Sequence, residues 1–221
     1  RLRRAGLGTR VVGVEIDRAR AERAGAWARP GLEFRHGGFN LPLGEGEAAV
    51  VVRAFNVLRQ YTPGEVTEAL EEVAAGMAPG GMLIEGTCDP WGRLACWWAW
   101  ERTGSQRLPW GEWPEPPLRR RWLVLGARMP GVLSPRAFQP YLPKELIHEA
   151  EPGGVLDGMF AAWEYGWVRA AGAPPRERWH AGLAGLAEAA PLVRWPALER
   201  RGLAVVRADA GPLAAVLRGV S

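Results

Sequence analysis

The chain alternates between short, almost wholly apolar runs and longer amphipathic stretches. Three apolar runs are bounded by turn residues, and they cover residues 10–14, 48–55 and 81–86. Runs of this length are typical of strands that are covered on both faces. A weaker run over residues 32–36 predicts a further strand.

Helical patterns separate these runs. Residues 17–28 are rich in Ala, Arg and Glu and begin at Asp17, which predicts a capped helix. Residues 63–77 place apolar side chains on one helical face, at Val66, Leu70, Val73 and Met77. Strand and helix therefore alternate, which predicts an α/β fold with a doubly wound, mostly parallel sheet and helices on both faces.

The connection over residues 37–47 is too short for the helical crossover that parallel neighbours usually need. We therefore expect it to run along the end of the sheet, from an outer strand toward the middle.

The second half of the chain has a different pattern. Residues 119–129 and 202–209 predict two late strands, the last of them antiparallel, around a proline-broken helical region over 136–192. Seven tryptophans precede or begin this part, and they predict a Trp-rich cover of helix and loop after the fifth strand: Trp91, Trp97, Trp98, Trp100, Trp110, Trp113 and Trp122.

Composition narrows the function classes. The 221 residues carry a net charge of +4, and all 28 basic residues except Lys144 are arginines, beside 29 Gly and 19 Pro. Compositional bias accounts for this charge, so a nucleic-acid partner is only weakly favoured. The two cysteines and three histidines lie too far apart in sequence for a metal site. Without a signal segment or a membrane span, we expect a soluble, cytoplasmic protein.

Glu15 is the first candidate for chemistry, because it directly follows an apolar strand. Open α/β sheets bind ligands at the carboxyl ends of their strands, and a carboxylate there can accept both hydroxyls of a ribose. The alternative is that Glu15 or Asp17 only caps the following helix.

Three motifs follow in order: GGFNLPL at 37–43, VVVRAFNVLRQY at 50–61 and MAPGGMLIEGTCD at 77–89. With VVGVEID at 11–17, the chain resembles the class I S-adenosylmethionine-dependent methyltransferases over about residues 1–90. The resemblance implies a Rossmann-like fold, S-adenosylmethionine as cofactor and methyl transfer to a small-molecule acceptor. It also implies one domain over 1–221, with 1–90 as the cofactor-binding half and 91–221 as cover, helices and late strands.

The resemblance also implies site residues. The second-strand motif carries over Glu15 and Ile16 toward the ribose. The acid that the family places in the next turn is replaced here by Gly38, so only the backbone of Gly38 and Phe39 and the Phe39 ring carry over, toward adenine. The fourth strand end nominates residues beside the methionine and methyl group, namely Ala54, Phe55 and Asn56.

Substrate contacts are expected from Arg59, Tyr61, Asp89 and Trp91, although such turn residues often only satisfy the backbone. Glu85 or Asp89 would serve as a general base, unless both are solvated loop acids. Methyl transfer needs no obligatory acid or base, because the leaving group is already activated, so no catalytic residue is assigned.

The sequence departs from the family at one point. The glycine-rich loop D/E-x-G-x-G, which approaches the methionine moiety, is absent, and residues 1–8 resemble the end of the helix that follows it. We expect an upstream segment to supply the loop and the first strand. The alternatives are a non-catalytic methyltransferase-fold protein or partner subunit, and an RNA methyltransferase, although the chain lacks an N-P-P-Y-type motif.

Overall fold

The computed structural model describes residues 10–129 and 134–219, so the expectation for residues 1–8 lies outside it. None of the helices in these two ranges is long and apolar enough to cross a membrane. The strands are β1 (Val11–Glu15), β2 (Leu32–His36), β3 (Ala49–Phe55), β4 (Met77–Cys88), β5 (Leu94–Arg102), β6 (Leu118–Ala127) and β7 (Leu203–Arg207). The helices are α1 (Arg18–Gly25), α2 (Pro63–Ala75), α3 (Asp157–Arg169), α4 (Pro175–Ala189), α5 (Pro196–Glu199) and α6 (Gly211–Gly219). Short 3-10 helices are η2 (Leu58–Gln60), η3 (Pro135–Tyr141), η4 (Lys144–Leu146) and η5 (His148–Ala150).

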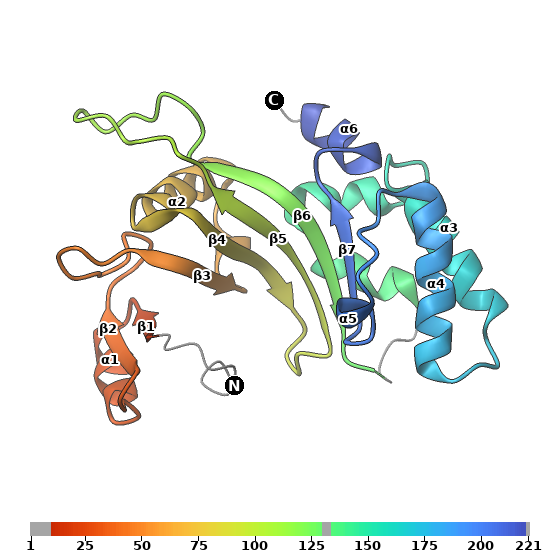
Figure 1. Ribbon diagram of the computed structural model, residues 1–221, viewed down its shortest axis with the longest axis horizontal. Helices are drawn as coiled ribbons and strands as arrows, with labels where there is room; N and C mark the ends of the chain where they lie inside the picture. The colour runs from red at the N-terminus through yellow and green to blue at the C-terminus, as the bar shows by residue number, and fades with distance from the viewer. Residues whose placement is uncertain (1–9, 130–133, 220–221) are drawn as a thin grey trace.

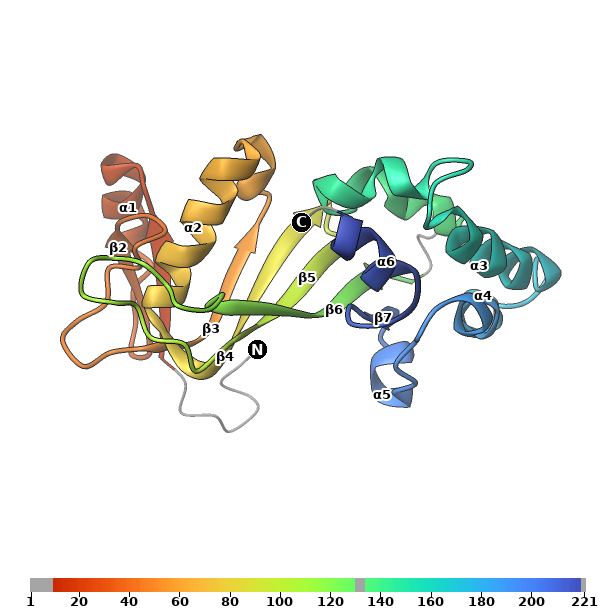
Figure 2. The same cartoon turned by 90° about the horizontal axis from the view of Figure 1, so that it is seen from above.

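The strands form two sheets (Figure 1). Strands β1 and β2 pair in parallel, and the second sheet has the order β3-β4-β5-β6-β7. Within it only β3 and β4 are parallel, while the other neighbours run antiparallel. Figure 2 shows α2 and the η3 segment on one side of the larger sheet, with α5 on the other.

The α/β class, the flanking helices and the antiparallel last strand are confirmed. The expectation of a mostly parallel sheet holds only for two strand pairs and is corrected for the rest. The reason is the turn over residues 89–93, which joins β4 to β5, because a connection this short can only link antiparallel strands.

The Trp-rich cover is also corrected. Trp97, Trp98 and Trp100 lie in β5, a strand that the sequence pattern did not predict. Aromatic side chains fit a pleated, half-buried surface well, and alternate residues of β5 pack on opposite faces. The sequence Asp-Pro-Trp-Gly at 89–92 is the local turn signal that matches this hairpin, although the strand predictions above did not use it.

The main core lies on the α2 side of the larger sheet. Trp98, Leu123 and Val206 are register neighbours on three strands and are at most 1% exposed. Phe138 of η3 covers this layer and stacks on Trp163 of α3, with ring centroids 5.4 Å apart. The tryptophans of the expected cover are thus divided among this core, the opposite face of the sheet, where Trp97 contacts Phe55, and exposed turns.

Strands β1 and β3 belong to different sheets, and each has one edge without a strand partner in the described part of the chain. Apolar side chains on or beside these strands are exposed, with Ile16 at 68% and both Val50 and Val51 at 59%. Residues 37–48 link the two sheets without a helix, as expected. Leu41 in this link packs against Gly76, where an added Cβ would meet the Leu41 side chain at 3.0 Å.

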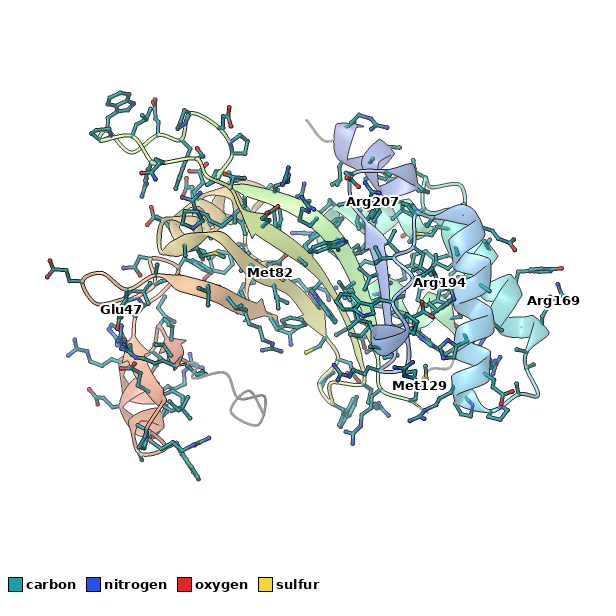
Figure 3. All side chains as sticks on the ribbon, viewed as in Figure 1. Glu47, Met82, Met129, Arg169, Arg194 and Arg207 are labelled. Carbon is teal, nitrogen blue, oxygen red and sulfur yellow. The ribbon has the colours of Figure 1, made fainter. Side chains whose placement is uncertain are left out.

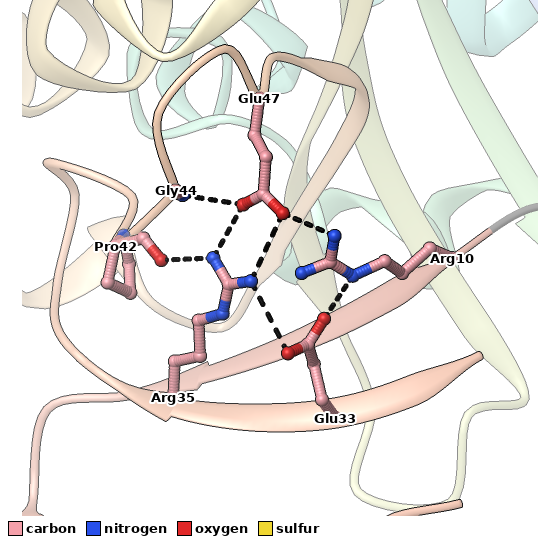
Figure 4. Close-up of polar contacts among 6 residues, drawn as sticks. All are labelled: Arg10, Glu33, Arg35, Pro42, Gly44 and Glu47. Atoms are coloured by element: carbon pink, nitrogen blue, oxygen red, sulfur yellow. Dashed lines mark hydrogen bonds and ion pairs between the residues drawn. The ribbon is translucent and has the colours of Figure 1, made fainter. Parts of the chain in front are cut away.

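A charged network fastens the link to the β1–β2 unit (Figure 4). Glu47 accepts hydrogen bonds from Arg35 at 2.7 and 3.3 Å and pairs with Arg10. Glu33 pairs with both arginines, and the Pro42 carbonyl accepts from Arg35 at 2.6 Å. The hydrogen bonds from Arg35 and from the Gly44 N–H lower the pKa of Glu47 to about 2.

This shift predicts acid sensitivity of the link. A carboxyl whose pKa is lowered on folding stabilises the protein above its ordinary pKa of 4.5 and loses that effect as the pH falls toward about 2. Glu47→Gln should therefore lower the free energy of unfolding at neutral pH, and the difference from wild type should shrink below pH 4.5. Denaturant unfolding at a series of pH values measures this. A difference that stays constant with pH would contradict it, and exposed Glu115→Gln is the matched control.

The two kinds of tryptophan predict different truncation costs. Trp98→Ala removes a side chain that is 1% exposed and should cost about 3–5 kcal/mol of stability. Trp110→Ala and Trp91→Ala remove side chains that are 69% and 70% exposed and should leave the melting temperature nearly unchanged. Thermal melts of the three variants test this assignment, which equal losses would refute.

Candidate functional site

The carboxyl end of β1 holds Glu15. Its carboxylate accepts from the Asp17 N–H at 2.9 Å and pairs with Arg20 at 3.2 Å, and its side chain is 32% exposed. The cap of α1 is Asp17, whose side chain accepts from the Arg20 N–H. Of the two acids, Asp17 thus performs the capping role, and Glu15 keeps an exposed face at the strand end.

The ends of β1 and β2 are tied together. The Gly37 N–H donates to the Glu15 carbonyl at 3.0 Å, and His36 Nε2 lies 3.0 Å from the Ile16 carbonyl oxygen. The Gly38 N–H donates to the Asn40 side chain at 3.2 Å, and an added Cβ at Gly38 would touch Ile16 at 3.9 Å. The predicted ribose and adenine residues therefore lie side by side.

Phe39 connects this pair of strand ends to the larger sheet. Its ring meets Tyr61 edge to face, with centroids 5.6 Å apart. Tyr61 follows η2, the short helix that comes after β3. The loops after β2 and β3 are therefore in contact. The structure thus brings the predicted substrate residue Tyr61 to the predicted adenine residue Phe39.

Asn56 joins the ends of β3 and β4. Its side-chain oxygen accepts from the Cys88 N–H at 2.9 Å, and its amide nitrogen donates to Cys88 Sγ at 3.2 Å. Its backbone N–H donates to the Gly86 carbonyl at 2.8 Å, and its φ of 60° lies in the left-handed region. Asn56 thus has a structural role, whatever it contacts in a ligand.

The neighbours of Asn56 divide between the two faces of the sheet. The rings of Phe55 and Trp97 have their centroids 5.7 Å apart, and the Arg53 guanidinium lies 4.1 Å from the centroid of the Phe55 ring. Ala54 is the register partner of Glu85 on β4 and shares its face.

The remaining predicted substrate residues do not converge on this edge in one cluster. Arg59 is exposed, and Trp91 is 70% exposed with the Arg93 guanidinium 4.8 Å from its ring. Asp89 is buried and accepts from the N–H groups of Arg93 and Leu94, forming the turn between β4 and β5. Burial alone would raise the pKa of Asp89, but these hydrogen bonds lower it, so Asp89 is a structural acid and a poor base.

Glu85 is the acid in an unusual environment. It is partly buried on the core side of the larger sheet, next to Trp98 in register. No hydrogen bond or ion pair links its carboxylate to another described residue. Burial, followed by the negative charge of Glu145, raises the pKa of Glu85 to about 7, against a smaller opposing effect of Arg120.

Glu145 and Arg120 complete what we call the Glu85 cluster, together with Trp98 and Trp100. Glu145 Oε1 accepts from the Trp98 indole at 3.0 Å and from Arg120 Nη2 at 3.2 Å. The Arg120 guanidinium lies over the rings of Trp100 and Trp98, at 4.5 and 5.5 Å. The Glu145 carboxylate is thus hydrogen-bonded by two donors, while Glu85 has none among the described residues and is left to gain or lose a proton.

Sequence reasoning missed both Arg120 and Glu145. Arg119 and Arg121, the outer members of a run of three arginines, pair with Glu101 at 2.7 and 3.1 Å. Arg120 lies on the opposite face, among the tryptophans. The alternation of side chains along a strand is the signal that separates them.

Comparisons with known proteins add little to this geometry. No family model matches the chain, and no curated protein matches it. Among solved structures, it is similar to the CcbJ methyltransferase from Streptomyces caelestis at 17% identity and a TM-score of 0.32, covering 57% of this chain and 54% of that one. It is also similar to SAM-bound CalS10, an amino pentose methyltransferase from Micromonospora echinaspora involved in calicheamicin biosynthesis, at 19% identity and a TM-score of 0.31, covering 54% and 53%.

The chain spans about half the length of these two solved structures. A likeness at this level establishes neither the family nor the function, which depend on the residues described above.

The Glu85 cluster predicts a titration near neutral pH. Glu85 should titrate at about 7 in wild type, and Glu145→Gln should lower its pKa, because the nearby negative charge is removed and Arg120 loses its partner. Carbon-detected NMR of the glutamate carboxyls measures both values. A carboxyl with a raised pKa destabilises the fold as the pH rises from 4.5 to about 7, and Glu85→Gln should abolish that loss. Titration of Glu85 near 4.5 would refute the assignment.

Proposed function

We propose that this protein transfers a methyl group from S-adenosylmethionine to a small-molecule acceptor. The observation that carries the proposal is that the predicted cofactor residues lie at the ends of consecutive strands, where several of them contact the end of a neighbouring strand or loop. His36 reaches Ile16 across β1 and β2, Phe39 reaches Tyr61, and Asn56 binds Cys88 across β3 and β4.

The residues fit the cofactor in two of its three parts. The Glu15 carboxylate is oriented by the Asp17 N–H and retains lone pairs for two ribose hydroxyls. Gly38 lies beside Ile16, and the Phe39 ring is partly buried against Tyr61, as suits one side of an adenine slot. Ala54, Phe55 and Asn56 would lie toward the methionine part.

The methionine part of the cofactor needs a glycine-rich loop after a strand. Residues 10–129 and 134–219 contain no such loop. We propose that a further strand between β1 and β3 completes the site and brings this loop. The unpaired edges of these strands and the exposed Val50 and Val51 support this. With the loop supplied, residues 1–221 would form one methyltransferase domain.

When bound, the cofactor supplies a methyl group on a sulfonium, which is already activated. The protein then has to orient the acceptor and exclude water. A non-catalytic methyltransferase-fold protein or partner subunit is the competing function, and the lack of a glycine-rich loop after a strand in residues 10–129 and 134–219 favours it.

Cofactor binding at Glu15 provides the test. S-adenosylhomocysteine binding is measured by calorimetry on this chain and, where the natural protein continues upstream, on the extended chain, which should also melt at a higher temperature. Glu15→Ala should weaken binding tenfold or more, because charge-assisted hydrogen bonds of about 1.5–3 kcal/mol each are lost. Exposed Glu115→Gln is the control. No binding by any form would support the non-catalytic function.

A further inference from the structure

The Glu85 cluster is the group of chemistry-bearing side chains that the cofactor proposal does not use. Glu85 is partly buried and has no hydrogen-bond partner among the described residues, whereas Glu145 is bound by both Trp98 and Arg120. The cluster also contains an unpartnered donor, because the indole nitrogen of Trp100 is buried without an acceptor in the described part of the chain, in a side chain 8% exposed. Arg120 Nε, a second buried donor of the cluster, also has no acceptor among the described residues.

The cluster is partly open to solvent. The side chains of Arg120 and Glu145 are 33% and 26% exposed, although their ion pair lies on the core side of the sheet. Glu85 is next to Ala54 in register, and Asn56, which binds Cys88, lies two residues after Ala54, just past the end of β3. The cluster therefore adjoins the strand end at which the methyl group is proposed to lie.

The charges of the cluster indicate which ligand it binds. Two carboxylates face one guanidinium, and that guanidinium is already paired with Glu145 and placed over two tryptophan rings. Ionised Glu85 thus leaves one negative charge uncompensated in a partly buried setting, which a cation with N–H donors would neutralise.

We propose that the Glu85 cluster binds the amino group of the methyl acceptor and that Glu85 takes its proton. This inference rests on the proposed methyl transfer. The ammonium gives one proton to the Glu85 carboxylate, and the freed lone pair on nitrogen forms the new N–C bond. The S–C bond breaks and leaves its electron pair on sulfur as a thioether. The product is a methylated ammonium, and Glu85 passes its proton to solvent.

The test measures amine binding without any cofactor, so it is independent of the proposed function. The probe is n-propylammonium, with n-propanol as the neutral control, followed by NMR shifts of the Glu85 carboxyl and the tryptophan indoles. Wild type should bind the amine and not the alcohol, and binding should strengthen as the pH rises through about 7, where Glu85 ionises beside Glu145 and Arg120. Glu85→Gln should weaken binding at least tenfold, while Glu115→Gln should not change it.

Equal binding of alcohol and amine, or amine binding that is independent of pH in wild type, would overturn the inference even if Glu85→Gln failed to fold. Amine binding together with no binding of S-adenosylhomocysteine by any form of the chain, the upstream-extended one included, would uphold the amine site and overturn methyl transfer. Cofactor binding without any amine binding would support methyl transfer and overturn the amine site.

Discussion

The position of the candidate site depends on a single joint between two sheets. Strands β1 and β2 share no hydrogen-bonded edge with the larger sheet, so backbone pairing does not fix their place. The joint consists of the Glu47 network and the packing of Phe39 and Leu41 against the second sheet. Since the predicted ribose and adenine residues lie on one side of this joint and the methionine residues on the other, its geometry sets the distance between the two halves of the site.

The larger sheet, in contrast, is held by packing. Its core side carries a continuous aromatic layer from Trp98 through Phe138 to Trp163. The same face also holds the Glu85 cluster, where the Arg120 guanidinium lies over the rings of Trp98 and Trp100. Figure 3 shows how the side chains fill the space between β6, β7 and α4. Polar chemistry and hydrophobic core therefore occupy neighbouring parts of one surface.

The sequence predicted the elements that have local signals. The strand at 32–36 and the cap at Asp17 match the structure, because apolar runs and side-chain caps act over a few residues. Strand β5 was missed, since Leu94–Arg102 has no β-branched residue and its tryptophans suited a cover equally well. The sequence indicated the separation of β1 from β3 only indirectly, through the expectation that an upstream segment supplies the first strand.

For the candidate site, the order of the motifs along the chain located the strand ends. The sequence also nominated Glu85 as a possible base, but it did not show the environment of that side chain. The Glu85 cluster joins β4, β6 and η4, which are far apart in sequence, and no local pattern indicates that Arg120 crosses two indole rings to reach Glu145. Likewise, no motif distinguishes the structural Asp89 from the unpartnered Glu85, because burial and hydrogen bonding decide between them.

The left-handed conformation of Asn56 bears on how relatives of this protein should be interpreted. Glycine would accept the φ of 60° but would lose both bonds to Cys88, and aspartate would lose the amide donor. Asparagine is therefore favoured at this position by the fold itself, through its left-handed backbone and its two bonds to Cys88. A descendant that had lost all catalysis would keep it under the same pressure, so an asparagine retained here across an alignment would record the inheritance of the fold and not of the reaction.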